Sequence, residues 1–161
     1  MSEELSEYRD RGARALVLLH EVHLRAFVAL WKRARAAGLV LPPCADPDYA
    51  SLESLLRHVL RAARGYMTWI CASLELEDPG IAEAPPVAGI GDAADRYVTE
   101  LLARWRTPLA GVAEERFGAP EHRSRWGVLY CIDAMLEHAV MHPIRHSFQL
   151  ESLLQAQGVA G

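Results

Sequence analysis

Apolar residues recur at spacings of three and four through long proline-free stretches of this chain, and this helical period constrains the fold more than any other feature. In the first stretch, residues 4–37, the period predicts an amphipathic helix. The apolar face expected for this helix contains Leu16, Leu19, His23, Ala26, Leu30 and Ala34. Gly38 then stands where a left-handed helix C-cap belongs, and the prolines at 42 and 43 prevent any continuation.

The same period predicts three further helices. The Asp-Pro-Asp turn at residues 46–48 offers a cap and an N1 proline for a second helix, which should end near residues 78–80. Asp92 is suited to cap a third helix, and Pro108 should end or kink that helix because proline lacks a backbone N–H. The last helix is expected from about residue 127 to residue 157, where Gly158 closes it.

These helices are expected to share one hydrophobic core. A chain of 161 residues is long enough to bury a full core as one unit, so residues 1–161 are assigned to a single domain. Residues 79–91 and 114–126 are expected to be connections without regular structure, and no strand-like alternation persists elsewhere. We therefore predict an all-α fold, a four-helix bundle with long inter-helix connections. Such connections permit a crossover topology as well as a simple up-and-down one.

Charge and hydropathy exclude several function classes. The formal net charge is -4 and the charged residues are interspersed, so no nucleic-acid partner is expected. The N-terminal segment is charged and no long apolar run is present, so we expect a cytoplasmic protein without a membrane partner. The cysteines Cys44, Cys71 and Cys131 are odd in number and widely spaced, which predicts reduced and mostly buried thiols.

Three of the histidines, His138, His142 and His146, are spaced four residues apart in the last expected helix. Positions four apart share one face of a helix, so the three imidazoles are expected to point into the core. The apolar residues on that face are Leu129, Ile132, Met135, Ala139, Leu150 and Leu153. Several buried imidazoles side by side are costly without a ligand, because each neutral ring has one donor and one acceptor to satisfy. The pattern therefore predicts one divalent transition-metal ion.

Helix geometry limits which histidines bind the same ion. His138 and His146 are two full turns apart, about 12 Å along the axis, so at most two of the three bind one ion easily. A third ligand must come from another helix, and His58, which borders the apolar stripe of the second helix, is the natural candidate. The alternative interpretation is ordinary core histidines that are hydrogen-bonded to the backbone or to Ser and Glu side chains.

At these residues the chain resembles the DinB/YfiT-like metalloenzymes. Residues 51–70, SLESLLRHVLRAARGYMTWI, are similar to the Leu-Leu-x-His segment of that family, and residues 137–150, EHAVMHPIRHSFQL, resemble its final His-x3-His-x3-His-x2-Gln segment. The resemblance covers most of the chain, although its motif residues lie in these two helices. The chain departs from the family pattern at Ser147-Phe148, where Arg-Gly is common, and at Pro143 inside the helix.

The resemblance implies a DinB-like four-helix bundle with a metal triad of His58, His142 and His146. It favours the 142/146 pair over 138/142 and makes His138 a residue of the surrounding pocket. Gln149 matches the glutamine of the family and is assigned to the same pocket.

Other side chains are weaker candidates for that pocket. Arg57 and Arg145 flank the proposed ligands and are suited to an anionic substrate, although such flanking positions usually face solvent. His20 and His23, three residues apart on the first helix, are candidates to line the same cavity. The four tryptophans are interpreted as core or rim, and His122 as exposed.

Three neutral imidazoles suit zinc, nickel or another late first-row ion, with a position left open for a small-molecule substrate. The resemblance implies a thiol-dependent S-transferase or isomerase that uses a low-molecular-weight thiol as cofactor. One alternative is a metal-assisted hydrolase, with Glu21 and Glu137 as weak general-base candidates. Another is a non-catalytic metal-binding or stress-related interaction domain. An exposed apolar face of the bundle would also permit a homodimer.

Overall fold

The computed structural model describes residue 5 and residues 7–158, and helices form nearly all of the regular structure in this part of the chain. The long helices are α1 (Arg11–Ala36), α2 (Leu52–Ser73), α3 (Ile90–Trp105) and α5 (Ile132–Ala156). The short elements are the 3-10 helix η1 (Pro47–Tyr49), the helix α4 (Glu115–Gly118) and the strands β1 (His122–Arg123) and β2 (Leu129–Tyr130). The expectation of a mostly helical fold is confirmed, since the only strands among the described residues are these two short ones.

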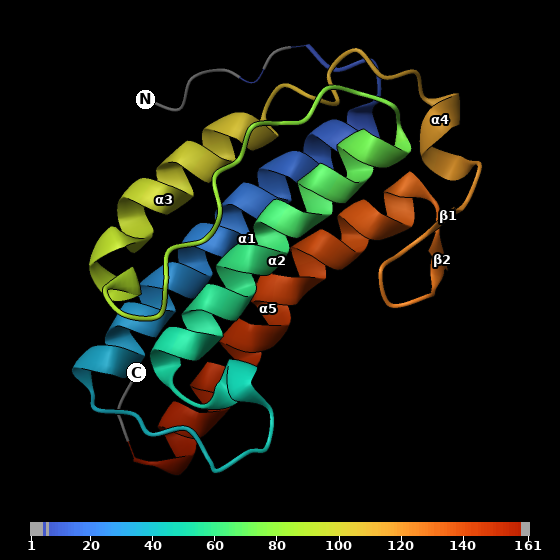
Figure 1. Cartoon of the computed structure of the whole chain (residues 1–161). Coiled ribbons are helices and arrows are strands. Elements are labelled where there is room, and N and C mark those ends of the chain that lie inside the picture. Colours follow the sequence, from blue (N-terminus) through green and yellow to red (C-terminus); the bar gives the residue numbers. More distant parts are fainter. Residues whose placement is uncertain (1–4, 6, 159–161) are drawn as a thin grey trace.

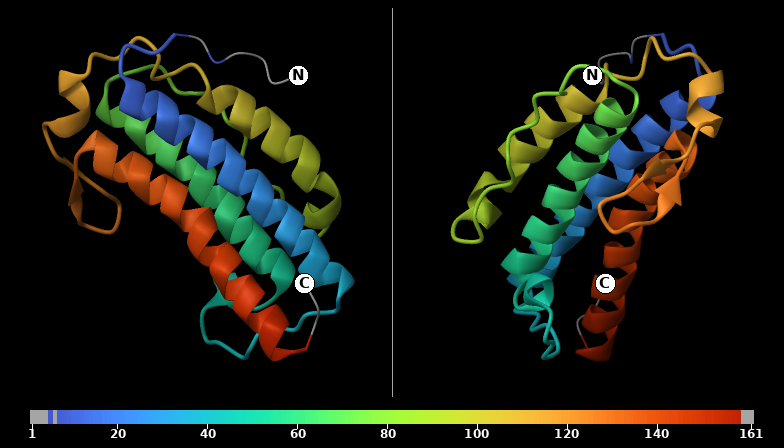
Figure 2. Two further views of the ribbon diagram at one scale, coloured as in Figure 1. Left: turned by 180° about the vertical axis from the view of Figure 1, so that it is seen from behind. Right: turned by 45° about the vertical axis from the view of Figure 1, so that its right-hand side comes forward.

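The long helices lie against one another, with α5 packed on α1 and α2, and with α3 packed on α1 and α2 (Figure 1). Helices α1 and α5 run in one direction, whereas α2 and α3 run in the opposite direction (Figure 2). Residues 74–89 therefore return along the outside of the molecule before α3 begins. This is the crossover alternative that the long connections permitted.

Buried indole groups join the helices through their N–H donors. The Trp31 Nε1 of α1 donates to the Leu52 carbonyl at 2.6 Å, and the Trp105 Nε1 of α3 donates to the Ala63 carbonyl at 3.1 Å. Both tryptophans are almost fully buried, so their polar atoms are satisfied inside the core. These two bonds hold α1 and α3 on α2. The interpretation of tryptophan as core is confirmed for this pair.

The first helix begins later than its periodicity predicts. The Asp10 carboxylate accepts a hydrogen bond from the Ala13 N–H at 2.6 Å, and this N-cap starts α1 at Arg11. The predicted start at residue 4 lies outside the described residues. The end is as expected, because Gly38 has a φ of 68° directly after the C-cap.

The apolar face expected for the first helix was wrong at two of its six positions, and two others, Leu16 and His23, are only half-buried. Leu19 is 44% exposed and Ala26 is exposed, whereas Leu30 and Ala34 are buried as expected. The residues that α1 buries are Ala13, Val17, His20, Leu24, Phe27, Val28, Leu30, Trp31 and Ala34. This stripe is wide because α1 contacts three other helices, α2, α3 and α5. A single narrow stripe of spacing three and four does not describe such a helix.

The boundaries of α2 and α3 also differ from expectation. Ser51 caps α2, since its side chain accepts from the Ser54 N–H at 3.0 Å, whereas Asp46 caps only η1. Helix α2 ends at Ser73, before the predicted end at residues 78–80. Helix α3 begins after Gly89, whose φ is 82°, and Asp92 lies in its first turn instead of at its cap.

The segment predicted to be an irregular connection contains a helical turn and a β-hairpin. Strands β1 and β2 pair antiparallel, with His122 opposite Tyr130. Leu129 therefore lies in β2, 48% exposed, and is not part of the last helix. Helix α5 begins at Ile132 because the Cys131 Sγ accepts from the Ala134 N–H at 3.5 Å. Strands of two residues are too short to show an alternating pattern in the sequence.

The remaining expectations concern α5, the cysteines and the membrane. Helix α5 continues through Pro143, and Gly158 follows its end with a φ of 72°. Burial raises the pKa of the Cys71 thiol to about 11. The expectation of mostly buried thiols was wrong, because Cys44 is exposed and Cys131 is half-buried. In the described part of the chain, no helix has the length and apolar character needed to cross a bilayer.

Candidate metal centre

The structure brings together His58 from α2 and His142 and His146 from α5. Each offers one ring nitrogen, and these three nitrogens lie within 4.8 Å of one another. The two histidines of α5 are four residues apart and therefore project from one face of the helix, which packs against α2. His142 and His146 are buried, and 21% of the His58 side chain is exposed. The cluster thus sits near the surface of the α2–α5 interface.

The separations within the cluster are close to those that one ion requires. The Nε2 atoms of His58 and His142 are 3.1 Å apart. Zinc binds histidine nitrogen at about 2.0–2.1 Å, so two nitrogens of a tetrahedral site are about 3.4 Å apart. This pair is therefore almost at the spacing of a tetrahedral site, and the third nitrogen, which lies within 4.8 Å of the other two, would have to move closer to them.

Two of the imidazoles are oriented by hydrogen bonds at their other nitrogen. The His58 Nδ1 lies 2.9 Å from the Asp48 Oδ2, and the His146 Nδ1 lies 2.8 Å from the Gln149 Oε1. A carboxylate and an amide oxygen only accept hydrogen bonds, so both Nδ1 atoms carry the proton and donate. In the neutral rings the Nε2 atoms then present lone pairs to the centre of the cluster. Carboxylate or carbonyl partners of this kind are typical of histidines that bind metals.

The buried imidazoles of the cluster are in the neutral form. Burial, reinforced by His146 and His58, lowers the pKa of His142 to about 2. Burial also lowers the pKa of His146 to about 4, against the raising effect of its hydrogen bond to Gln149. Both rings are therefore neutral at pH 7, which is the form that binds metal. Among the described residues, the His142 Nδ1 and the His146 Nε2 are buried without any hydrogen-bond partner.

These unpartnered atoms disfavour the interpretation as ordinary core histidines. A core histidine normally pairs both ring nitrogens with the backbone, side chains or water, because a lone pair left buried costs about 1–3 kcal/mol. Here the His146 Nε2 faces other imidazoles instead of a donor. A divalent cation would satisfy it, so the residues present fit a three-histidine metal site.

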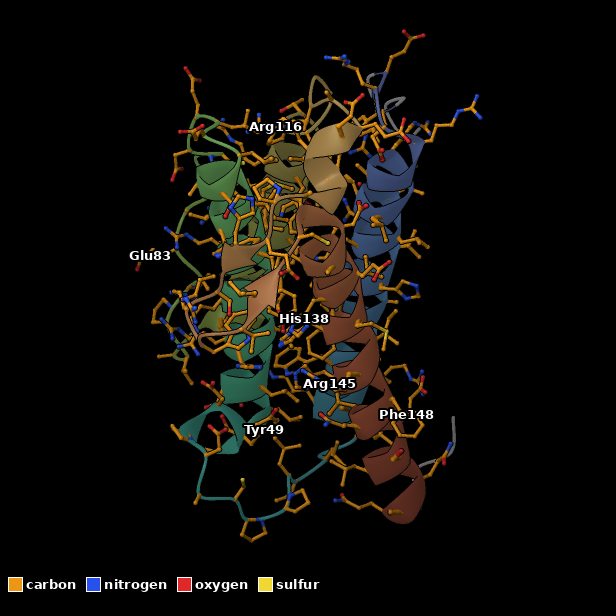
Figure 3. The ribbon with its side chains drawn as sticks, turned by 90° about the vertical axis from the view of Figure 1, so that its right-hand side faces the viewer. Tyr49, Glu83, Arg116, His138, Arg145 and Phe148 are labelled. Carbon is orange, nitrogen blue, oxygen red and sulfur yellow. The ribbon has the colours of Figure 1, made fainter. Side chains whose placement is uncertain are left out.

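His138, the third histidine of the stripe, lies beside the cluster and outside it. Its ring stacks on Trp126 at 5.8 Å and meets the rings of Tyr66 and Tyr130 edge-on at 5.5 and 5.7 Å. Burial lowers the pKa of His138, and the charge of the exposed Arg145 adds to this effect there and at His142 and His146. Figure 3 shows Arg145 and His138 along the α2–α5 interface, with Tyr49 beyond them. Both residues thus border the cluster.

His20 and His23 are not part of this cluster. The His20 ring is fully buried and stacks on Trp105 of α3, with ring centroids 3.7 Å apart and planes 12° apart. The half-buried His23 lies one turn further along α1, and neither residue lines the cavity described next. The placement of these two histidines in the same cavity as the triad was therefore wrong. His20 lies on the face of α1 that packs toward α3.

A cavity of about 180 Å³ opens beside His58 and His142. Its walls come from α2, from the start of α5 and from the turn of the hairpin. The residues that line it, besides the two histidines, are Arg61, Ala62, Gly65, Tyr66, Trp69, Arg125, Trp126 and Met135. Trp69 and Trp126 therefore form a rim, as the sequence interpretation allowed. A ligand in this cavity would touch both a metal ligand and a cationic side chain.

The sequence interpretation missed several of these residues. Asp48 was interpreted only as part of a turn, although its position ten residues before His58 places it near the first turns of α2. Arg61 and Arg125 gave no signal, because their proximity depends on how the hairpin folds back on α2. His122 was expected to be exposed, but it is half-buried, and its ring lies edge-on to Trp69 at 6.0 Å.

Comparisons of the chain with models of protein families, with curated proteins and with solved structures found no match. The chemistry of the cluster and of its cavity is therefore the guide to function.

Proposed function

We propose that the protein is a metal-dependent enzyme of the DinB-like type, in which His58, His142 and His146 hold one divalent ion, zinc or nickel, within a four-helix bundle. The observation that carries this proposal is the convergence of three imidazole nitrogens from two helices within 4.8 Å of one another. A donor set made only of imidazoles suits late first-row ions and is unattractive to magnesium or calcium.

An open coordination position supports a catalytic site over a structural one. Structural zinc sites have four protein ligands, whereas catalytic sites have three and leave the fourth position to water or substrate. Because His58 and His142 also line the cavity, a small molecule in the cavity would lie next to that position. When bound, the ion would lower the pKa of a coordinated thiol or water toward neutrality.

The residues around the ion have distinct supporting roles. Asp48 and Gln149 fix the orientation of two imidazoles, as their hydrogen bonds indicate. Burial raises the pKa of Tyr66 to about 12, so its phenol keeps its proton and can donate to a ligand in the cavity. Trp126 stacks on His138 at the mouth of the cavity.

Within this type we propose a thiol-dependent S-transferase or isomerase, in which a low-molecular-weight thiol occupies the open position and attacks an electrophilic small molecule. The hydrolase alternative lacks a positioned general base. Glu21 is paired with Arg106 at 3.0 Å, Glu137 is exposed, and neither lines the cavity. Asp48, the carboxylate bonded to the cluster, is occupied by His58 and Arg61.

Elemental analysis tests the metal site directly. We expect about one equivalent of zinc or nickel in the purified protein and a loss of nearly all of it in His58→Ala and His142→Ala. His23→Ala is the matched control, because this half-buried histidine lies outside the cluster. Equal and substoichiometric metal in all four proteins would overturn the site.

A cobalt-substituted protein tests the thiol. We expect glutathione, mycothiol or bacillithiol to change the cobalt absorption spectrum and to support turnover of an electrophile. Unchanged spectra and no turnover with all three thiols would reject the thiol-dependent reaction while leaving the metal site intact. Chelation followed by thermal melting then distinguishes a catalytic ion from one that only stabilises the fold, because removal of a structural ion should unfold the protein.

A further inference from the structure

The cavity beside the histidine cluster continues into a second hollow that is strongly cationic. The two share Arg61, Gly65, Trp69 and Arg125, and the second hollow has a volume of about 460 Å³. Its wall adds Arg57 and Arg64, whereas Glu83 is the carboxylate that lines it. Figure 3 shows Glu83 projecting from the 74–89 connection at the edge of the molecule. Positive charge therefore exceeds negative charge along this hollow.

The four arginines differ in how far they are already engaged. Arg57 and Arg64 donate through Nε to the carbonyl groups of Pro85 and Ile81, which leaves the ends of their guanidinium groups free of those bonds. Arg61 pairs with Asp48 at 3.1 Å. Within residue 5 and residues 7–158, the Arg125 guanidinium has no hydrogen-bond or ion-pair partner. Arg125 is thus a cation that lines the cavity and has no counterion among these residues.

The hairpin holds Arg125 and Trp126 at the mouth of this cavity. They occupy the two central positions of a turn that is closed by a hydrogen bond of 3.0 Å from the Gly127 N–H to the Ser124 carbonyl. The Trp69 Nε1 donates to the Arg123 carbonyl at 3.2 Å and so ties the hairpin to α2. The positions of these two side chains are therefore set by both the turn and α2.

Gly65 keeps the floor of both cavities open. Glycine in the middle of a helix is unfavourable, because it lacks a side chain and gains freedom in the unfolded chain. A Cβ at this position would lie 3.5 Å from the Arg125 Nη2, which is ordinary contact, so close packing alone does not require glycine. A longer side chain would fill the space that leads from Arg125 to the histidines. This unfavourable residue thus marks the place where a ligand would lie.

We propose that this cavity binds a small organic oxyanion, a carboxylate or a phosphate, with its charge on Arg61 and Arg125 and its planar body between Tyr66, Trp69 and Trp126. Arginine matches both oxyanions through paired N–H donors, and aromatic walls suit a flat apolar group. The volume of about 180 Å³ next to the histidines fits a group of about one aromatic ring. This anion site depends on the proposed function in one respect: the proposed metal ion would lie next to the inner end of the ligand.

Calorimetric titration with benzoate, phenyl phosphate and the neutral analogue benzamide tests this site. The titrations use the chelated protein and the zinc-loaded protein, both at low ionic strength. We expect at least one of the anions to bind both forms, and the tighter of the two identifies the preferred oxyanion. Loss of a charge-assisted contact should raise the Kd of that anion about tenfold or more in Arg125→Gln. Benzamide should bind more weakly than the anions to the wild-type protein.

Two further variants separate a specific site from general attraction to a basic surface. Arg96→Gln is the matched control, because this side chain is 83% exposed on α3 and its ion pair with Glu100 is long, at 4.0 Å. It should leave the Kd unchanged. Gly65→Leu keeps every charge but fills the cavity, so it should abolish binding of the anion while the zinc content stays the same. Arg125→Gln alters only an exposed side chain and serves the test even where Gly65→Leu fails to fold.

Equal Kd values for Arg125→Gln, Arg96→Gln and wild type would overturn the proposal, as would equal binding of benzamide and benzoate. If the anion binds only the zinc-loaded protein, and Arg125→Gln leaves its Kd unchanged, then the anion coordinates zinc alone. That result overturns this site but supports the proposed metal centre. Anion binding that depends on Arg125 in a protein unable to retain zinc would support this site and reject the proposed function. The two proposals therefore fail separately.

Discussion

Replacement of His20 by phenylalanine should reduce the acid sensitivity of this fold. His20 is fully buried against Trp105, and neither of its ring nitrogens has a hydrogen-bond partner among the described residues. Burial lowers its pKa from 6.5 to about 3. The unfolded chain therefore takes up a proton at this residue below about pH 6.5, whereas the folded protein does so only near pH 3.

The sign and the size of the effect follow from this difference. Because the unfolded state binds more protons in this window, stability is fully present above the unfolded pKa and falls as the pH drops toward the folded pKa. One pH unit corresponds to about 1.4 kcal/mol per group. The titration of His20 should therefore lower the free energy of unfolding by about 2 kcal/mol between pH 7 and pH 5. Phenylalanine keeps a ring to stack on Trp105 and does not titrate.

Urea denaturation of both proteins at pH 7 and at pH 5, in the presence of a chelator, measures this quantity. The comparison is the change of the unfolding free energy with pH within each protein, so packing differences between the two rings cancel. The contributions of His142 and His146 are common to both proteins and also cancel. His23→Gln is the control and should follow the wild type. If His20→Phe and wild type lose the same free energy to within about 0.5 kcal/mol, the burial argument for His20 is wrong.

Three other substitutions have defined outcomes. Asp48→Ala removes the acceptor that orients His58 and should weaken zinc affinity about 10–100-fold in a competition titration with a chromophoric chelator, while Asp95→Ala, an exposed carboxylate on α3, should not. Gly65→Ala adds a methyl group in ordinary contact and should raise the unfolding free energy by about 0.5–1 kcal/mol in urea; a loss would mean that the cavity floor is already packed. Ser51→Ala removes the cap of α2 and should cost about 1 kcal/mol of stability by thermal melting, whereas Ser152→Ala, an exposed position on α5, should have little effect.

Helices and the histidine cluster could be predicted from the sequence because both depend on local spacing. The four-residue interval between His142 and His146 determines their common face whatever the rest of the chain does. His58 could be proposed from its place on the second apolar stripe, but its choice over other partners needed either the resemblance or the structure. Helix starts were less predictable, since each depends on which of several capping side chains accepts the first hydrogen bond, as at Asp10 and Ser51.

Contacts made by distant segments could not be predicted. His20 lies on the face of α1 that meets α3, and the sequence does not state which neighbour a helix face meets. Arg125 and Trp126 reach the site only because a hairpin of two-residue strands turns back on α2, and that hairpin has no periodic pattern. Asp48 lies outside α2, and its approach to His58 depends on the path of a short 3-10 helix.

The helices and the hairpin supply different parts of the site, and these parts differ in how much substitution they tolerate. The histidines that would hold an ion come from α2 and α5, whose packing the core depends on, so that part of the site tolerates little variation. The outer wall comes from a turn whose side chains, including Trp126 at 51% exposure, add little to the core. Substitutions at the exposed positions Arg125, Trp126 and Val128 would therefore alter which molecules reach the centre at small cost in folding free energy. The hairpin is the part of the site that laboratory evolution can vary while the helical scaffold stays constant.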